Sequence, residues 1–104
     1  MDKQSIKVAK KFGKKIKRKF DVKNLILFGS RARGDNLKYS DYDFIIVSNK
    51  FKGKKFVLRA SDLYDYWNEK QDLEVICYTP KEFERKKKQI GIVKTAVEKG
   101  IEIK

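Results

Sequence analysis

Residues 25–47 read LILFGSRARGDNLKYSDYDFIIV, and this stretch decides the fold. It begins within a short apolar run, 24–28, that Gly29-Ser30 closes, a pattern typical of a strand buried on both faces. It ends in a second β-rich run, 41–47, which starts with acidic residues and continues as an apolar segment. The stretch therefore predicts two strands separated by a polar turn, with polar side chains where the first strand ends and the second begins.

The flanking segments alternate between helix and strand patterns. Upstream, an apolar stripe with four-residue steps on a basic segment predicts an amphipathic helix. This stripe consists of Val8, Phe12, Ile16 and Phe20. Downstream, the patterns predict a mobile Lys/Gly loop over 49–55, a helix from Ser61 or Asp62 to about Lys70, and a strand over 72–78. The capping box Thr79-Pro80-Lys81-Glu82 then predicts the start of another helix. The last segments predict more helix over 90–99 and a short edge strand over 101–103. This alternation predicts one α/β (α+β) domain over residues 1–104, in which a small mixed sheet of about three to five strands is covered by helices.

The composition narrows the chemistry. The 104 residues include no histidine and a single cysteine, Cys77. Ser-His-Asp and Cys-His catalysis, a His-ligated zinc site and an internal disulfide are therefore excluded. A catalytic metal would need oxygen ligands, which favours Mg²⁺ or Mn²⁺. No apolar run approaches the roughly 20 residues of a membrane span and no signal-peptide pattern is present, so we expect a cytoplasmic protein without membrane attachment.

The charge is strongly positive and unevenly distributed. The chain carries 27 Lys and Arg residues against 14 Asp and Glu, a formal net charge of +13. The excess gathers in residues 1–20 and 81–104, around a nearly balanced middle. This arrangement suits a polyanionic partner such as RNA, an acidic protein or the phosphates of a nucleotide. A lysine-rich solvated helix face gives the same count, so both interpretations stay open.

Gly29 and Ser30 directly follow the first predicted strand. A glycine lets the backbone approach a phosphate closely, and a serine offers N–H and hydroxyl donors. The loop is not a Walker A motif, because Asp35-Asn36 stand where that motif requires Lys and Ser or Thr. Alone, the Gly-Ser pair is more typical of an ordinary turn between a strand and a helix.

Acidic side chains alternate at the start of two predicted strands. Asp41 and Asp43 point to the same side of the chain, where their charges repel unless a cation lies between them. This pair therefore predicts a divalent metal site. Glu74 would complete a site of three carboxylates if its strand is adjacent, and Asp72 is the rival candidate. Alternatively, Asp41 is only a polar residue in the turn where the strand begins, and Glu74 faces water on a sheet that is buried on one side.

Together, Gly29-Ser30, Asp41-x-Asp43 and the later acidic residue resemble the DNA polymerase β-like nucleotidyltransferase superfamily. The stretch LILFGSRARGD…SDYDFIIV is similar to its minimal nucleotidyltransferases. The resemblance implies that Gly29 and Ser30 contact a triphosphate. It implies that Asp41 and Asp43 bind two divalent metal ions, Mg²⁺ or Mn²⁺, with Glu74 as the third carboxylate. ATP is the implied donor, and an acceptor hydroxyl attacks its α-phosphate in line.

The resemblance also bears on neighbouring residues and on partners. Arg31 and Arg33 are candidates for neutralising phosphate charge, although they could equally be surface residues. Minimal nucleotidyltransferases are often paired with small helical HEPN proteins, in which the HEPN protein is a ribonuclease toxin. This chain would then be the antitoxin that adenylylates such a partner, with tyrosine as a candidate acceptor.

Other functions stay open at the level of sequence. One is a non-catalytic antitoxin or RNA-binding module on the same fold, and another is a transferase that acts on RNA ends. The sequence is also compatible with a homo-oligomer. The aromatic cluster Tyr64, Tyr66 and Trp67 either docks a partner or packs its helix onto the sheet, and packing is the favoured interpretation.

Overall fold

The predicted sheet is present and is mixed. The computed structural model describes residues 3–104. Its elements are α1 (Lys3–Ile16), β1 (Val22–Phe28), α2 (Ser30–Arg33), β2 (Tyr42–Ser48), the 3-10 turns η1 (Asn49–Phe51) and η2 (Phe56–Leu58), α3 (Ser61–Tyr64), β3 (Leu73–Tyr78), α4 (Pro80–Lys86), α5 (Ile92–Lys99) and β4 (Ile101–Glu102). The strands lie in the order β3-β2-β1-β4, with β3 parallel to β2 and β1 antiparallel to both of its neighbours. The predicted fold class is therefore confirmed.

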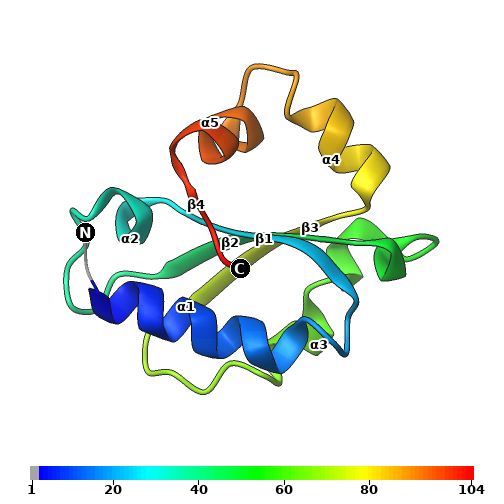
Figure 1. Cartoon of the computed structure of the whole chain (residues 1–104). Helices are drawn as coiled ribbons and strands as arrows, with labels where there is room; N and C mark the ends of the chain where they lie inside the picture. The colour runs from blue at the N-terminus through cyan, green and yellow to red at the C-terminus, as the bar shows by residue number, and fades with distance from the viewer. Residues whose placement is uncertain (1–2) are drawn as a thin grey trace.

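The helix α1 lies on one face of the sheet, and α4 and α5 lie on the other (Figure 1). Alternate residues of β1, β2 and β3 serve two cores, one on each face. On β2, Phe44 and Ile46 lie in the larger core with residues of α1, whereas Ile45 and Val47 lie in the smaller core with residues of α4 and α5. The same alternation places Asp43 on the face that α4 and α5 cover. These two helices therefore border the candidate site, and α1 supports the sheet from behind.

The helix α1 packs through the apolar stripe seen in the sequence. Val8, Phe12 and Ile16 are buried, and the Phe12 ring centroid lies 5.3 Å from that of Phe44. Burial of each such side chain stabilises the fold by about 1.5–3 kcal/mol. The helix ends at Ile16, so Phe20 follows in a turn, although its side chain still packs against the same core.

The segment between β2 and β3 is better anchored and less helical than expected. Phe51 of η1 is only 2% exposed and belongs to the larger core, so the segment predicted as a mobile loop is tied down by an aromatic side chain. The helix α3 ends at Tyr64 instead of continuing to about Lys70. Beyond it, the indole N–H of Trp67 donates a 2.7 Å hydrogen bond to the backbone oxygen of Gln71, which holds a non-helical turn.

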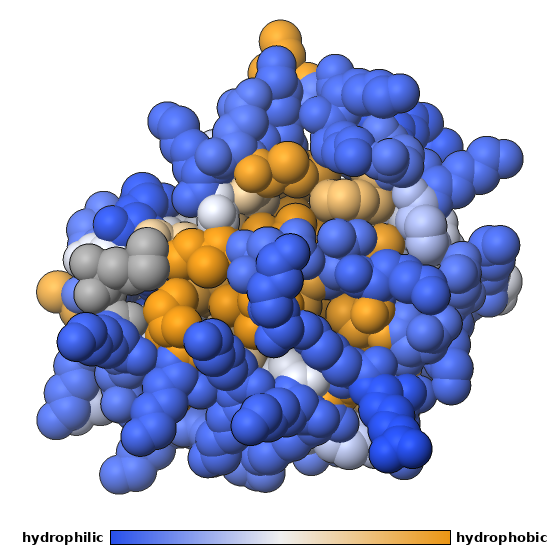
Figure 2. Space-filling view, viewed as in Figure 1, coloured by the Kyte–Doolittle hydropathy of each residue, from blue (hydrophilic) through white to orange (hydrophobic). Residues whose placement is uncertain are grey.

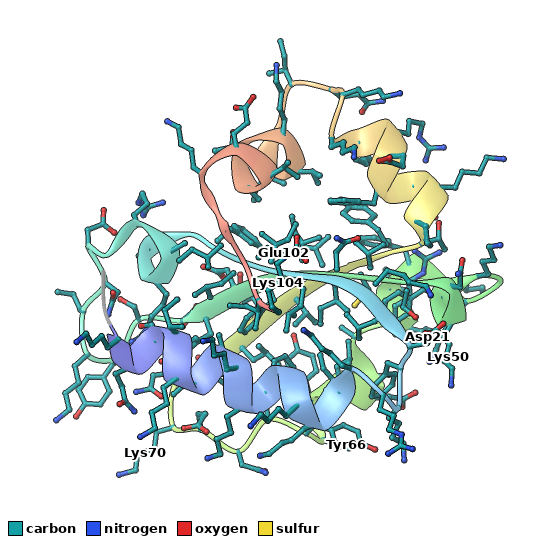
Figure 3. The ribbon with its side chains drawn as sticks, viewed as in Figure 1. Asp21, Lys50, Tyr66, Lys70, Glu102 and Lys104 are labelled. Atoms are coloured by element: carbon teal, nitrogen blue, oxygen red, sulfur yellow. The ribbon has the colours of Figure 1, made fainter. Side chains whose placement is uncertain are left out.

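Two of the three clustered aromatic residues pack inward. Tyr66 and Trp67 lie partly buried against the larger core. Tyr66, labelled in Figure 3, meets the ring of Phe20 edge-on with the ring centroids 5.6 Å apart. Tyr64 is 45% exposed. Packing therefore explains Tyr66 and Trp67, while Tyr64 remains at the surface.

The start of α4 shows the predicted capping box and ties it to a distant loop. The Thr79 hydroxyl accepts from the N–H of Glu82, and the Glu82 carboxylate accepts from the N–H of Thr79 at 2.8 Å. The same carboxylate accepts two hydrogen bonds from the guanidinium of Arg59, at 2.6 and 3.2 Å. These hydrogen bonds, led by those from Arg59, hold the pKa of Glu82 at about 2. A buried arginine thus joins the segment before β3 to the helix after it.

The surface is largely hydrophilic. Figure 2 shows apolar residues gathered between α1 and the two C-terminal helices, surrounded by polar ones. No helix within residues 3–104 has the length and apolar character needed to cross a membrane.

We expect Glu82→Gln to lower the free energy of unfolding by about 2 kcal/mol at pH 7, because it removes the charge that pairs with Arg59 but keeps a side chain able to cap Thr79. The folded-state pKa of Glu82 lies below its usual 4.5, so the stabilisation is complete above about pH 4.5 and is lost as the pH falls towards 2. Denaturant unfolding of both proteins from pH 7 to pH 3 measures this loss. Glu84→Gln, in the exposed pair with Lys87, is the matched control and should change stability by less than about 0.5 kcal/mol.

Candidate functional site

The strand β1 brings the chain directly against the carboxylate of Asp43. The antiparallel register pairs Phe28, the last residue of β1, with Asp43 of β2. The next residue, Gly29, has φ 75° and ψ −157°, a backbone conformation that is essentially restricted to glycine. A Cβ atom at Gly29 would lie 2.4 Å from Oδ2 of Asp43, closer than such atoms can approach. The turn therefore requires glycine, and any other residue here would also push the Asp43 carboxylate aside.

Three of the predicted site residues converge here. The parallel register pairs Asp43 with Glu74 of β3, and Asp41 lies immediately before β2. Burial, followed by the charges of Glu74 and Asp41 and a hydrogen bond with Glu74, raises the pKa of Asp43 to about 6, and the charge of Arg33 opposes this rise. Asp43 is half-buried, whereas Asp41 and Glu74 are exposed. Such crowding of like charges in a partly dry position is typical of a functional site.

The rival acidic residue, Asp72, lies outside this cluster. It is exposed and precedes β3, and its backbone oxygen accepts a 2.9 Å hydrogen bond from the N–H of Tyr42. The carboxylates that raise the pKa of Asp43 are those of Glu74 and Asp41. The structure therefore places Glu74, rather than Asp72, beside the aspartate pair.

The donor atoms of this cluster fit a hard divalent cation. Within residues 3–104, no group of three or more His, Cys, Asp or Glu side chains is arranged so that it could hold a metal ion as it stands. The carboxylates of Asp41, Asp43 and Glu74 nevertheless supply oxygen ligands, which Mg²⁺ and Mn²⁺ prefer. A cation among them would relieve the repulsion that raises the pKa of Asp43. These three residues would hold the metal, and metal dependence itself stays a prediction.

Arg31 occupies a structural position, which differs from the phosphate-binding role predicted for it. The residue is 3% exposed, and its guanidinium donates to the backbone oxygens of Ser40 and Lys38 at 2.9 and 3.1 Å. It also donates to the hydroxyl of Ser5 in α1 at 3.0 Å and lies over the ring of Tyr42, 4.3 Å from its centroid. Arg31 therefore fixes the loop that leads to Asp41.

Arg33 is the arginine of this loop that faces the carboxylates. Its side chain is exposed and pairs with Asp35 at 3.1 Å. Its charge lowers the pKa of Asp43 and so opposes the other causes that raise it. Because exposed ion pairs contribute little, the guanidinium can exchange Asp35 for the phosphate of a ligand.

A pocket that no local sequence pattern indicated lies beside the loop. Its volume is about 220 Å³, and its lining includes Gly29 and Arg33 together with Thr95 and Lys99 of α5. The sequence of α5 predicts a helix but does not say which element that helix packs against. Thr95 and Lys99 could therefore be recognised as site neighbours only after the packing of α5 was known.

Comparison with known proteins agrees with this arrangement. The sequence pattern of the family described as nucleotidyltransferase domain matches residues 9–102, which includes both Gly29-Ser30 and the three carboxylates. This chain belongs to the nucleotidyltransferase domain family. No curated protein matches its sequence significantly.

A solved structure is similar to this nucleotidyltransferase domain. It is a 1.40 Å crystal structure from Sulfolobus solfataricus, of a protein whose own nucleotidyltransferase function is inferred. The two chains share 26% sequence identity with a TM-score of 0.64, over 79% of this chain and 73% of the other. The fold and the nucleotidyltransferase assignment are therefore supported by sequence and structure together.

We expect Gly29→Ala to destabilise this nucleotidyltransferase by about 3 kcal/mol, because it adds a contact with Asp43 to a strained backbone conformation. Gly53→Ala is the matched control, since Gly53 also has a positive φ, 74°, but no atom lies within 4 Å of its added Cβ. It should cost about 1 kcal/mol. Denaturant unfolding of both variants, and of Gly29→Ala combined with Asp43→Ala, measures the contact. An equal cost for Gly29→Ala with and without the Asp43 carboxylate would contradict this interpretation.

The two loop arginines should separate in a stability measurement. Arg31→Met removes the buried hydrogen bonds to Ser40, Lys38 and Ser5, and we expect it to lower the free energy of unfolding by about 3 kcal/mol. Arg33→Met changes an exposed side chain and should shift it by less than about 0.5 kcal/mol. Thermal unfolding followed by circular dichroism distinguishes them, and equal effects would show that Arg31 is not the anchor of the loop.

Proposed function

We propose that this domain is a metal-dependent nucleotidyltransferase that transfers a nucleotidyl group, AMP from ATP, to an acceptor hydroxyl. The observation that carries the proposal is the close approach of the Gly29 backbone to a half-buried carboxylate, Asp43, that is flanked by Asp41 and Glu74. A place for a triphosphate and a place for divalent cations are thereby adjacent, as nucleotidyl transfer requires. Membership of the family supports the same class of reaction.

The residues after β1 would hold the donor. Gly29 begins the loop that would carry the phosphates, and its lack of a side chain lets the Asp43 carboxylate lie against the same stretch of backbone. Ser30 adds a hydroxyl donor, and the exposed guanidinium of Arg33 adds positive charge on the same side as Asp43. The chain can therefore orient the triphosphate with its α-phosphate near the carboxylates.

The carboxylates would serve the transfer step itself. Asp41, Asp43 and Glu74 would hold two ions of Mg²⁺ or Mn²⁺, which would neutralise the triphosphate and activate the acceptor oxygen. The acceptor oxygen forms a bond to the α-phosphorus while the bond to the departing pyrophosphate breaks on the opposite side. Glu74 is exposed on the edge strand β3 and would receive the acceptor's proton. Asp43, held against Gly29, would keep the centre of the site rigid.

The acceptor would be supplied by a second molecule. By the resemblance to minimal nucleotidyltransferases, we propose a HEPN-family protein with an acceptor tyrosine, which makes this chain a cytoplasmic protein adenylyltransferase and the antitoxin of a pair. The open side of the site favours a macromolecular acceptor, because Glu74 is exposed on the edge strand β3 and Tyr64 is 45% exposed. Burial, followed by the charge of Glu74, raises the pKa of Tyr64. The net charge of +13 also suits RNA, which is the competing acceptor.

With α-labelled ATP, Mg²⁺ or Mn²⁺ and a cell extract as the acceptor source, we expect label to enter one small protein. Asp41→Ala and Asp43→Ala should each lower this transfer at least about a hundredfold, because both remove a carboxylate from the site. Glu74→Gln should have a comparable effect, whereas the matched variant Asp72→Asn should remain near the wild-type rate. Gel separation of labelled protein from labelled RNA measures both the rate and the class of acceptor.

The alternatives give different results in the same experiment. A non-catalytic antitoxin or RNA-binding module on this fold would transfer no label while remaining folded, and Asp41→Ala would increase its stability by relieving repulsion. A transferase acting on RNA ends would label RNA and would lose its acceptor affinity steeply with salt. Equal transfer by Glu74→Gln and wild type would remove Glu74 from the site.

A further inference from the structure

The pocket between the loop after β1 and the helix α5 has no role in the site described so far. One wall is formed by Gly29, Ala32 and Arg33, and the other by Ile92, Thr95 and Ala96, with Lys99 also in its lining. Its volume is about 220 Å³. Gly29 belongs both to this pocket and to the contact with Asp43, so the pocket and the carboxylates are continuous through one residue.

The pocket and the carboxylates also lie on the same face of the sheet. Ile45 and Val47, which share the parity of Asp43 on β2, belong to the core formed with α4 and α5. Ala96 of α5 belongs to that core and also lines the pocket. A ligand bound at Gly29 can therefore reach both the carboxylates and the pocket without crossing the sheet.

The lining of the pocket favours a ring over a phosphate. Ala32, Ile92 and Ala96 offer apolar walls that cannot donate hydrogen bonds to phosphate oxygens. The hydroxyl of Thr95 already donates to the backbone oxygen of Gly91 at 3.2 Å. The charged residues of the lining are Arg33 and Lys99, and a guanidinium such as that of Arg33 can also stack on a flat ring. An apolar pocket with a few polar groups is typical of sites for the organic part of a ligand.

We infer that this pocket holds the base of the donor nucleotide, while the loop after β1 holds its phosphates. The inference rests on the proposed nucleotidyl transfer and adds the residues of α5 to the donor site. Ile92 and Thr95 would contact the base, and Arg33, at the junction of loop and pocket, would serve both parts of the donor. In this arrangement α5 is what makes the domain bind a nucleotide in preference to a bare polyphosphate.

The test compares two ligands on the intact domain. The first is α,β-methylene ATP with Mg²⁺, which cannot be turned over, and the second is inorganic tripolyphosphate with Mg²⁺, which lacks a base. Thr95→Phe fills the pocket from an exposed position, and Val97→Phe is the matched control because Val97 lines a different pocket on the same helix. Calorimetric titration gives the dissociation constants, and circular dichroism checks that each variant is folded.

We expect Thr95→Phe to raise the dissociation constant of the methylene analogue by about tenfold or more and to change that of tripolyphosphate by less than about twofold. Val97→Phe should leave both dissociation constants unchanged. Ile92→Ser, which removes one apolar wall at a residue that is 55% exposed, should weaken the analogue by about threefold without affecting folding. Unchanged analogue binding in both pocket variants would overturn the inference and leave the transferase proposal standing. Equally weakened binding of both ligands would assign the pocket to phosphates and would also overturn the inference. A wild-type domain that binds neither ligand would overturn the inference and the proposed function together.

Discussion

The approach of the Gly29 backbone to the Asp43 carboxylate is the constraint on which the site depends. A Cβ at Gly29 would lie 2.4 Å from Oδ2 of Asp43, so this carboxylate can keep its place against the end of β1 only because residue 29 has no side chain. The pairing of Phe28 with Asp43 fixes the register of the two strands at the same point. The register that buries the apolar residues of β1 and β2 is thus also the register that brings the loop to the carboxylate.

The parts of the structure that follow from local pattern were predictable from the sequence. The apolar run before Gly29 and the alternation that begins at Asp41 and Asp43 each predict a strand, and the capping box at Thr79 predicts the start of a helix. The convergence of Glu74 with the aspartates was foreseen only conditionally, because sequence does not show which strands are neighbours. The parallel pairing of β2 with β3 supplies that missing information.

The parts that depend on tertiary contact could not be predicted. Arg31 and Arg33 are chemically identical and two residues apart, yet one is buried against Ser5, 26 residues away, while the other is exposed beside an acidic cluster. Nothing in the loop itself decides which guanidinium turns inward. Phe51 illustrates the same limit, since its Lys/Gly surroundings predict a mobile loop and only the core that receives its ring makes it an anchor.

The strand order gives the proposed reaction a direction. Because the sheet runs β3-β2-β1-β4, the loop after β1 lies on one side of Asp43 and Glu74 of β3 lies on the other. The side of β1 is enclosed by α5, which suits a small donor, whereas β3 is an edge strand and leaves Glu74 exposed. A small ligand and a large one can therefore approach the same half-buried carboxylate from opposite sides without competing for space. In a domain of 104 residues, this division explains how one sheet could serve a nucleotide and a macromolecular acceptor together.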